Sequence, residues 1–116
     1  MTLDELIARD GGACVWCGRE PWRRDLTAEH VLPRRRQGRG VPENLAVACR
    51  TCNRRRRTRA VVSFVRQQLD AGEHPQLERL ADVLQRLSAS RSRAHADYGR
   101  RQLELLGSVT GSRGSR

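Results

Sequence analysis

The sequence predicts a small α+β domain that binds a metal in its first half and continues into a helical extension. Two Cys-x-x-Cys pairs, Cys14–Cys17 and Cys49–Cys52, have the spacing of ligands to one structural zinc ion. Short apolar segments bounded by Gly and Pro lie between the pairs, and apolar residues recur at helical spacing after residue 60. The 116 residues include one Phe, one Tyr and two Trp, so the core is thin and a metal would stabilise it.

The first half is expected to form two helices and two short strands. Thr2 and Glu5 have the spacing of a capping box, which predicts a helix that ends at Gly11–Gly12. A metal-binding turn follows at 14–18. We then expect a strand over 26–32 that Pro33 ends, a loop over 34–43, a return strand over 45–47, and a helix from about 49–52 through 59.

The second half is expected to be helical. Apolar positions predict one helix through Val61 to Leu69 with a cap at Gly72, a second over 77–87 and a weaker third over 94–106. The Gly- and Ser-rich end is expected to be disordered. The predicted division is a zinc-stapled domain at 1–59, a helical extension at 60–106 and a disordered tail at 107–116. The leucine stripe of 77–87 is either a dimer seam or, as we favour, cover for the protein's own core.

The charge of the chain favours a polyanionic partner. The formal net charge is +10, and all 23 basic residues are Arg. Residues 14–59 hold 13 of these arginines against four acidic residues, so the excess coincides with the cysteine pairs. Arg suits bidentate contacts with phosphate, although a GC-rich genome is an alternative reason for the missing Lys.

The N-terminus and the hydropathy predict a cytoplasmic protein without membrane segments. Residues 1–10 include acids and no long apolar run, so they do not resemble a signal peptide. No segment approaches the ~20 apolar residues of a membrane helix. Reducing conditions would keep the four cysteines available for zinc, and two disulfides are the alternative.

Glu29, His30 and Asn53 are the candidate residues for phosphodiester hydrolysis. The 31 residues between Cys17 and Cys49 exceed the spacing of simple zinc motifs, and this insert contains Glu29-His30. An imidazole suits the activation of water, and the oxygens of Glu29 and Asn53 are of the kind that Mg²⁺ accepts. On a strand, however, Glu29 and His30 would point to opposite faces. Cations for the substrate would come from Arg34, Arg35, Arg36, Arg39, Arg54, Arg55, Arg56 and Arg57.

In combination, these motifs resemble the HNH endonuclease family in its four-cysteine form. The pattern consists of the two cysteine pairs, Glu29-His30-Val31-x-Pro33, Asn44-Leu45 and an Asn directly after the last cysteine. The resemblance covers about residues 3–59. It implies a ββα-metal fold, in which two strands and a helix hold one catalytic divalent ion.

The resemblance also implies a role for each matching residue. His30 would be the general base, Glu29 and Asn53 the ligands of Mg²⁺ or a similar ion, and Asn44 the brace of the loop that orients His30. The four cysteines would bind structural zinc. The family often has Lys shortly after the final Asn, and here Arg56 or Arg57 takes that place. The implied reaction is cleavage of DNA that leaves 5′-phosphate and 3′-hydroxyl ends.

We therefore expect a metal-dependent HNH endonuclease that acts on DNA. A zinc-containing nucleic-acid-binding module without catalysis is the alternative, and an RNA-directed nuclease is chemically close. The sequence leaves open whether the protein is a monomer or a homodimer, which site it cuts and what role the helical extension has.

Overall fold

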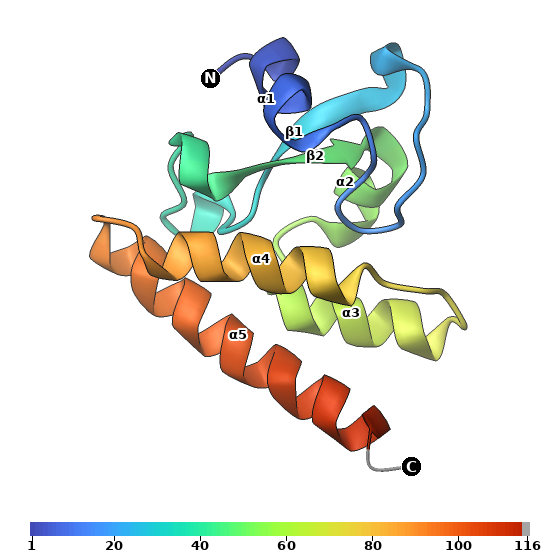
Figure 1. Cartoon of the computed structure of the whole chain (residues 1–116), viewed down its shortest axis with the longest axis vertical. Helices are drawn as coiled ribbons and strands as arrows, with labels where there is room; N and C mark the ends of the chain where they lie inside the picture. The colour runs from blue at the N-terminus through green and yellow to red at the C-terminus, as the bar shows by residue number, and fades with distance from the viewer. Residues whose placement is uncertain (115–116) are drawn as a thin grey trace.

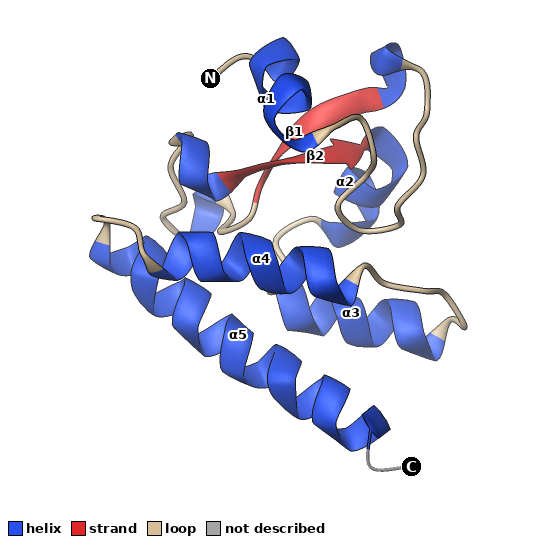
Figure 2. Cartoon of the chain, in the orientation of Figure 1, coloured by secondary structure: helices blue, strands red, loops and turns tan. Residues whose placement is uncertain are grey.

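The computed structural model describes residues 1–114 as a β-hairpin followed by helices (Figures 1 and 2). The helices and strands are α1 (Leu3–Asp10), β1 (Leu26–His30), β2 (Leu45–Cys49), α2 (Arg50–Arg56), α3 (Val61–Asp70), α4 (Leu77–Ser88) and α5 (Arg93–Gly114). Three 3₁₀ turns are η1 (Arg23–Asp25), η2 (Arg34–Arg36) and η3 (Pro42–Asn44). The predicted α+β fold, with a hairpin, a helix and C-terminal helices, is confirmed.

Helix α1 covers one face of the hairpin (Figure 1). The predicted capping box is present, because the Glu5 amide donates to the Thr2 hydroxyl at 3.1 Å and the Thr2 amide donates to the Glu5 carboxylate at 3.0 Å. Leu6 of this helix is buried in a small cluster with Leu26, Leu45 and Val47. Helix α1 therefore stabilises the hairpin face that carries Leu26.

The two strands are antiparallel, and their register sets the faces of the site. Leu26 lies opposite Cys49, and His30 lies opposite Leu45. Strand β1 ends at His30, two residues earlier than expected, because the chain turns there into the loop that Asn44 holds. Strand β2 is two residues longer than expected and reaches Cys49.

The opposite face of the hairpin packs on the helical half in one hydrophobic cluster. The Trp16 and Phe64 rings meet edge to face with centroids 5.1 Å apart. Helix α2 ends at Arg56, earlier than expected, because Arg57 takes a positive φ of 54°. The proposed boundary at residue 59 falls after this break, yet the residues on either side of it share a core.

Helices α4 and α5 form an antiparallel layer on the far side of the hairpin from α1 (Figure 1). Leu80, Leu84 and Leu87 are fully buried, so the leucine stripe covers the protein's own core, as we favoured. We predicted a disordered tail from residue 107, whereas α5 extends to Gly114 and buries Leu106 and Val109 in the main cluster. Residues 115 and 116 of that predicted tail lie outside the described residues.

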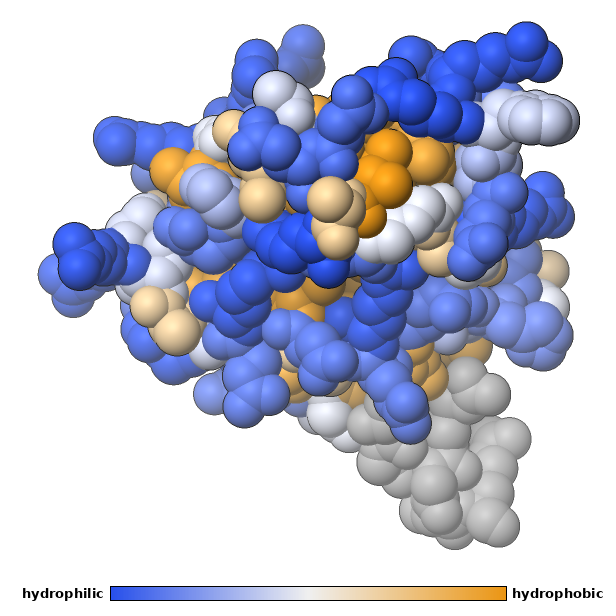
Figure 3. Space-filling view, turned by 45° about the horizontal axis from the view of Figure 1, so that its top comes forward, coloured by the Kyte–Doolittle hydropathy of each residue, from blue (hydrophilic) through white to orange (hydrophobic). Residues whose placement is uncertain are grey.

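Among the described residues, the exposed large apolar side chains are those of Met1 and Trp22. The face in Figure 3 carries mainly hydrophilic side chains, with apolar side chains visible in small areas between them. Within residues 1–114, no helix is both long and apolar enough to cross a bilayer.

Candidate functional site

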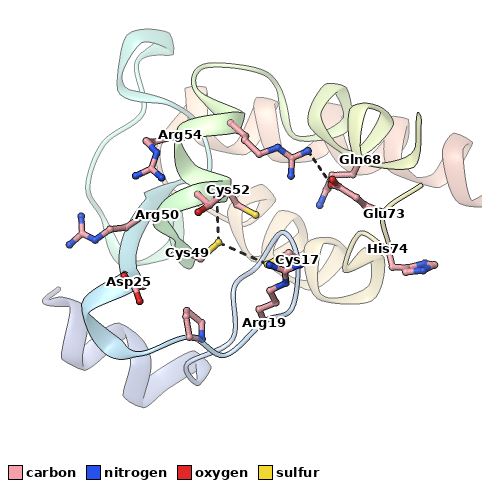
Figure 4. A pocket seen from close by; sticks show the side chains of 13 residues that line it. Cys17, Arg19, Asp25, Cys49, Arg50, Cys52, Arg54, Gln68, Glu73 and His74 are labelled. Atoms are coloured by element: carbon pink, nitrogen blue, oxygen red, sulfur yellow. Dashed lines mark hydrogen bonds and ion pairs between the residues drawn. The ribbon is translucent and has the colours of Figure 1, made fainter. Parts of the chain in front are cut away.

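The four cysteines form one compact cluster between the first turn and the start of α2. Figure 4 shows three of them, Cys17, Cys49 and Cys52. All four are free thiols, and their sulfur atoms lie within 4.8 Å of one another. Cys17 Sγ and Cys49 Sγ are 4.0 Å apart. The Trp16 amide donates to Cys14 Sγ, and the Cys52 amide donates to Cys49 Sγ, so each pair forms the tight turn that a metal-binding knuckle requires.

The close packing of the sulfur atoms shifts the pKa values of the cysteines in opposite directions. A hydrogen bond from the Cys52 thiol lowers the pKa of Cys14 to about 4, whereas the pKa of Cys52 is raised by that same contact, by burial and by the neighbouring thiols. Thiolates this close repel one another, so four of them ionise together only around a positive ion. The donor set and its size fit zinc, which binds four sulfurs at ~2.3 Å in a tetrahedron. The cluster is therefore consistent with the predicted structural zinc site.

A groove of about 650 Å³ lies beside the cysteines. Its basic lining residues come from both knuckles and from α2: Arg19, Arg50, Arg54 and Arg55. Asp25 and Glu73 also line it, and Arg55 pairs with Glu73 at 3.1 Å. A zinc ion bound by four thiolates would carry a net negative charge, which these arginines would offset.

His30 lies at the end of β1, where the strand meets the arginine-rich loop. Its imidazole is half-buried, and Arg34 Nε donates to His30 Nε2 at 3.3 Å. Burial and the nearby Arg34 charge both lower the pKa of His30. Both effects favour a neutral imidazole, in which Nδ1 carries the proton and Nε2 accepts the hydrogen bond from Arg34. Such a group can accept a proton from water.

Asn44 closes the loop that follows His30. Its side chain is fully buried; Oδ1 accepts from the Leu32 amide at 2.8 Å, and Nδ2 donates to the Leu32 and Arg39 carbonyls. The Val31 amide donates to the Asn44 carbonyl at 2.9 Å. These bonds join Asn44 to Leu32 and to Arg39 across the loop. The role of Asn44 in orienting His30 stays a prediction.

Glu29 has different partners from those expected of a metal ligand. It is 4% exposed; its Oε2 accepts from Trp16 Nε1 at 3.0 Å, and its Oε1 lies 3.4 Å from Arg56 Nη1. Burial raises the pKa of Glu29, and the contacts with Arg56 and Trp16 oppose that rise. Because Glu29 and His30 are still in a regular strand, Glu29 faces the core and His30 the other side.

Arg56 is a second departure from the expected site. We expected it to contact nucleic acid, but its side chain is 0% exposed and stacks 5.1 Å over the Trp16 ring. Its guanidinium donates to the His30, Val31 and Arg59 carbonyls and to the Tyr98 hydroxyl. That expectation is wrong in this structure, because the guanidinium's donors are directed at internal acceptors. Arg56 instead joins α2 to the end of β1.

The expected catalytic ion does not fit Glu29 in this arrangement. A divalent ion at the carboxylate would have to displace a buried guanidinium and an indole N–H, both of which are already bound there. Asn53 lies one turn before Arg56 on α2 and is half-buried. Its role as a ligand stays a prediction, whereas this geometry does not support that role for Glu29.

The buried pair gives a testable expectation for stability. We expect Arg56→Met to lower the free energy of unfolding by about 3–5 kcal/mol, because it leaves the Glu29 carboxylate buried without its counter-charge. Urea denaturation of the zinc-loaded protein measures this change. Adding Glu29→Gln should recover part of the loss, since the uncompensated charge is then gone.

The neighbouring pair supplies the control. The side chains of Arg55 and Glu73 are 33% and 39% exposed, so Arg55→Met should cost about 1 kcal/mol or less. If Arg56→Met costs no more than Arg55→Met, the ion pair with Glu29 does not stabilise the fold.

The remaining arginines of the predicted set are accessible to a substrate. Arg34, Arg35, Arg36 and Arg39 are exposed on the loop after His30, Arg54 and Arg57 are exposed on or just after α2, and Arg55 is half-buried. Arg19 and Arg50 also line the groove beside the cysteines, and neither was predicted from the sequence. Arg19 follows the first cysteine pair and Arg50 lies within the second, so the charges around the pairs were the signal for them. His95 and Tyr98 also contact the site region, and no local signal in the sequence indicates this.

Comparisons with known proteins agree with the geometry of the first half. The model of the family described as HNH endonuclease matches residues 14–59. No curated protein and no solved structure matched the chain. The match begins at the first cysteine, ends after α2 and contains the hairpin, His30 and Asn44. Residues 14–59 are therefore a domain of the HNH endonuclease family, built around a four-cysteine cluster.

Proposed function

We propose that this protein is an endonuclease that hydrolyses phosphodiester bonds in DNA, with His30 as the general base. The observation that carries the proposal is a half-buried imidazole whose Nε2 faces the basic loop, within an HNH-family domain. A binding module has no need of a proton acceptor at this position. The alternative is a nucleic-acid-binding module without catalysis, and the assay below distinguishes the two.

The chemistry assigned to His30 is that of its Nε2 atom, the acceptor nitrogen of the ring. Nε2 takes a proton from a water molecule as the water oxygen bonds to phosphorus. The bond from phosphorus to the 3′ oxygen then breaks, and that oxygen acquires a proton. The products are a 5′-phosphate and a 3′-hydroxyl. Arg34, which now donates to Nε2, is exposed and can turn its guanidinium to the substrate phosphate, leaving Nε2 to the water.

Two metals belong to the proposal in different ways. Zinc in the four-cysteine cluster would hold the knuckles together and so set the position of α2. Mg²⁺ or a similar ion would offset the charge on the phosphate and the leaving oxygen. Because Glu29 does not fit as a ligand here, we assign no step to that ion. Asn53 is kept as the candidate ligand on α2.

The proposed setting agrees with the chemistry of the cysteines. We place the protein in the cytoplasm, where thiols stay reduced and zinc can occupy the cluster. DNA is the proposed partner, because the exposed arginines of the loop and of α2 carry a strong positive charge. Monomer and homodimer are both compatible with the proposal. Residues 60–106 are proposed as an extension of the nuclease domain.

A plasmid-nicking assay tests the proposal directly. Zinc-loaded protein is incubated with supercoiled DNA and Mg²⁺, Mn²⁺ or Ni²⁺, with a chelator control, and DNA binding is measured in parallel. Nicking with one of these ions supports the nuclease. Tight binding without any cutting supports the binding module instead. A matched RNA substrate shows which nucleic acid is preferred.

The exposed arginines should make binding strongly dependent on salt. If Arg35 and Arg54 each contact a phosphate, replacing both by Ala should reduce the slope of log K against log salt by ~0.9 per contact. Fluorescence anisotropy of a labelled duplex over a salt series measures that slope. Arg66→Ala, on the exposed face of α3, is the control and should leave the slope unchanged. An unaltered slope in the Arg35/Arg54 variant would put the DNA elsewhere on the protein.

A further inference from the structure

Helix α5 contacts the loop after His30 through His95. The His95 side chain is 0% exposed, and the Arg39 amide donates to His95 Nε2 at 3.1 Å, between residues 56 positions apart. His95 lies in the first turn of α5. One turn later, a side chain at Gly99 would come within 2.6 Å of the Ser88 amide nitrogen, so α5 lies directly against the end of α4. The position of the imidazole is therefore set by close backbone packing.

His95 is also one of two residues in the described part of the chain that have a buried side-chain polar atom without a hydrogen-bond partner. Since Nε2 accepts a hydrogen bond, the proton of the neutral ring is on Nδ1, and Nδ1 is the unpartnered atom. Burial is also the main cause that lowers the pKa of His95, in keeping with a neutral ring. An apolar residue would avoid this unsatisfied group. The presence of a histidine here is explained by its Nε2 atom, which accepts a hydrogen bond from the Arg39 amide.

The contact leads from Arg39 to the proposed base. The Arg39 carbonyl accepts from Asn44 Nδ2 at 2.9 Å, so both peptide groups of Arg39 are held, one by α5 and the other by Asn44. The next residue, Gly40, lies close to the His30 imidazole. A Cβ at Gly40 would lie 3.5 Å from His30 Nε2, the nitrogen that would take the proton. The backbone at Arg39 and Gly40 thus forms one wall of the space around that atom.

We propose that His95 is a positioning residue of the nuclease site, which holds the Arg39–Gly40 backbone against His30 and thereby connects the C-terminal helices to catalysis. The role rests on the proposed function of His30. This role would give the helical half a part in the reaction that its sequence does not indicate. Helix α5 holds the loop through His95, and Asn44 holds it from the other side. The contact is made by the Arg39 backbone, and the Arg39 side chain itself is exposed.

Three variants separate positioning from general stability. His95→Phe keeps a ring but removes the acceptor, whereas His95→Gln keeps an acceptor on a side chain of similar reach. Gln102→Met is the matched control, because Gln102 is also a buried residue of α5 whose Oε1 accepts from a backbone amide, that of Val62 on α3. It supports the fold by the same kind of bond without touching the loop.

The kinetic readout is plasmid nicking at a temperature at which every variant is folded. We expect His95→Phe to lower kcat by about 10- to 100-fold with little change in KM, because small displacements in an active site have effects of this order. His95→Gln should recover most of the rate. Gln102→Met should keep the wild-type kcat even where its melting temperature falls as far as that of His95→Phe. Equal kcat values for His95→Phe and the wild type would overturn the proposal.

A second readout does not depend on activity. Long-range ¹H–¹⁵N spectra of the histidine rings report the environment and tautomer of His30. His95→Phe should shift the His30 ring signals, and Gln102→Met should not. If the wild type cuts nothing but the His30 signals move, the nuclease function fails and the contact through Arg39 stands. If the signals stay in place, the positioning role fails even in an active enzyme. His95→Leu replaces His95→Phe if the larger ring prevents folding.

Discussion

Replacing Cys14 or Cys49 by Ser is expected to unfold the hairpin half of the protein. A structural zinc site contributes ~10–16 kcal/mol of apparent binding free energy, which matches or exceeds the ~5–15 kcal/mol total stability of a small domain. Cys14 also belongs to the main hydrophobic cluster, together with Trp16 and Phe64. The loss should therefore spread into α3, and a single cooperative melt should disappear.

Circular dichroism melts with a parallel zinc determination measure this result. Thr51→Ser is the control, since Thr51 is an exposed residue in the same turn as Cys49 and Cys52. It should keep both the melt and one zinc ion per chain. A native-like melt in either cysteine variant after exhaustive removal of zinc would show that the cluster is not a structural metal site.

Replacing His30 by Ala is expected to reduce the nicking rate by ~10²–10⁴-fold, the contribution of a general base. The fold should survive, because Arg56 binds the backbone carbonyl of His30 and not its side chain. DNA affinity should also survive, since the exposed arginines are unchanged. The measurements are the nicking rate, the affinity for uncut duplex and the melting temperature. A variant that cuts as fast as the wild type would leave a nuclease with another mechanism.

Glu29→Gln tested with the same metals decides between the two roles considered for Glu29. Loss of a metal ligand should raise the Mg²⁺ concentration needed for half-maximal rate. Loss of the partner of Arg56 should lower stability and leave the metal dependence unchanged, which is the result we expect from the geometry. Asn53→Ala is the companion variant, because Asn53 remains the candidate ligand on α2.

Features encoded by near neighbours could be predicted from the sequence alone. The capping box of Thr2 and Glu5, the turns at the two cysteine pairs and the leucine helix over 77–87 each depend on residues within a few positions. The α+β fold followed from these local patterns and from the spacing of the pairs. The role of Asn44 as the loop's brace came from the resemblance to the HNH family and stays a prediction; its side chain bonds to Leu32, 12 residues earlier, and to Arg39.

The tertiary structure decided which side chains face the core and which contacts join distant segments. Glu29 was expected to be a ligand, but strand alternation turns it towards the core, where Arg56, 27 positions further along the chain, neutralises it. Residues from 107 onwards resemble a flexible tail in composition, yet α5 continues past Leu106 and Val109, which are buried in the main cluster. His95 meets Arg39 over a separation of 56 residues. These contacts depend on tertiary packing. Burying a polar group is costly unless it finds a partner, and here the partners come from segments that are distant in the sequence.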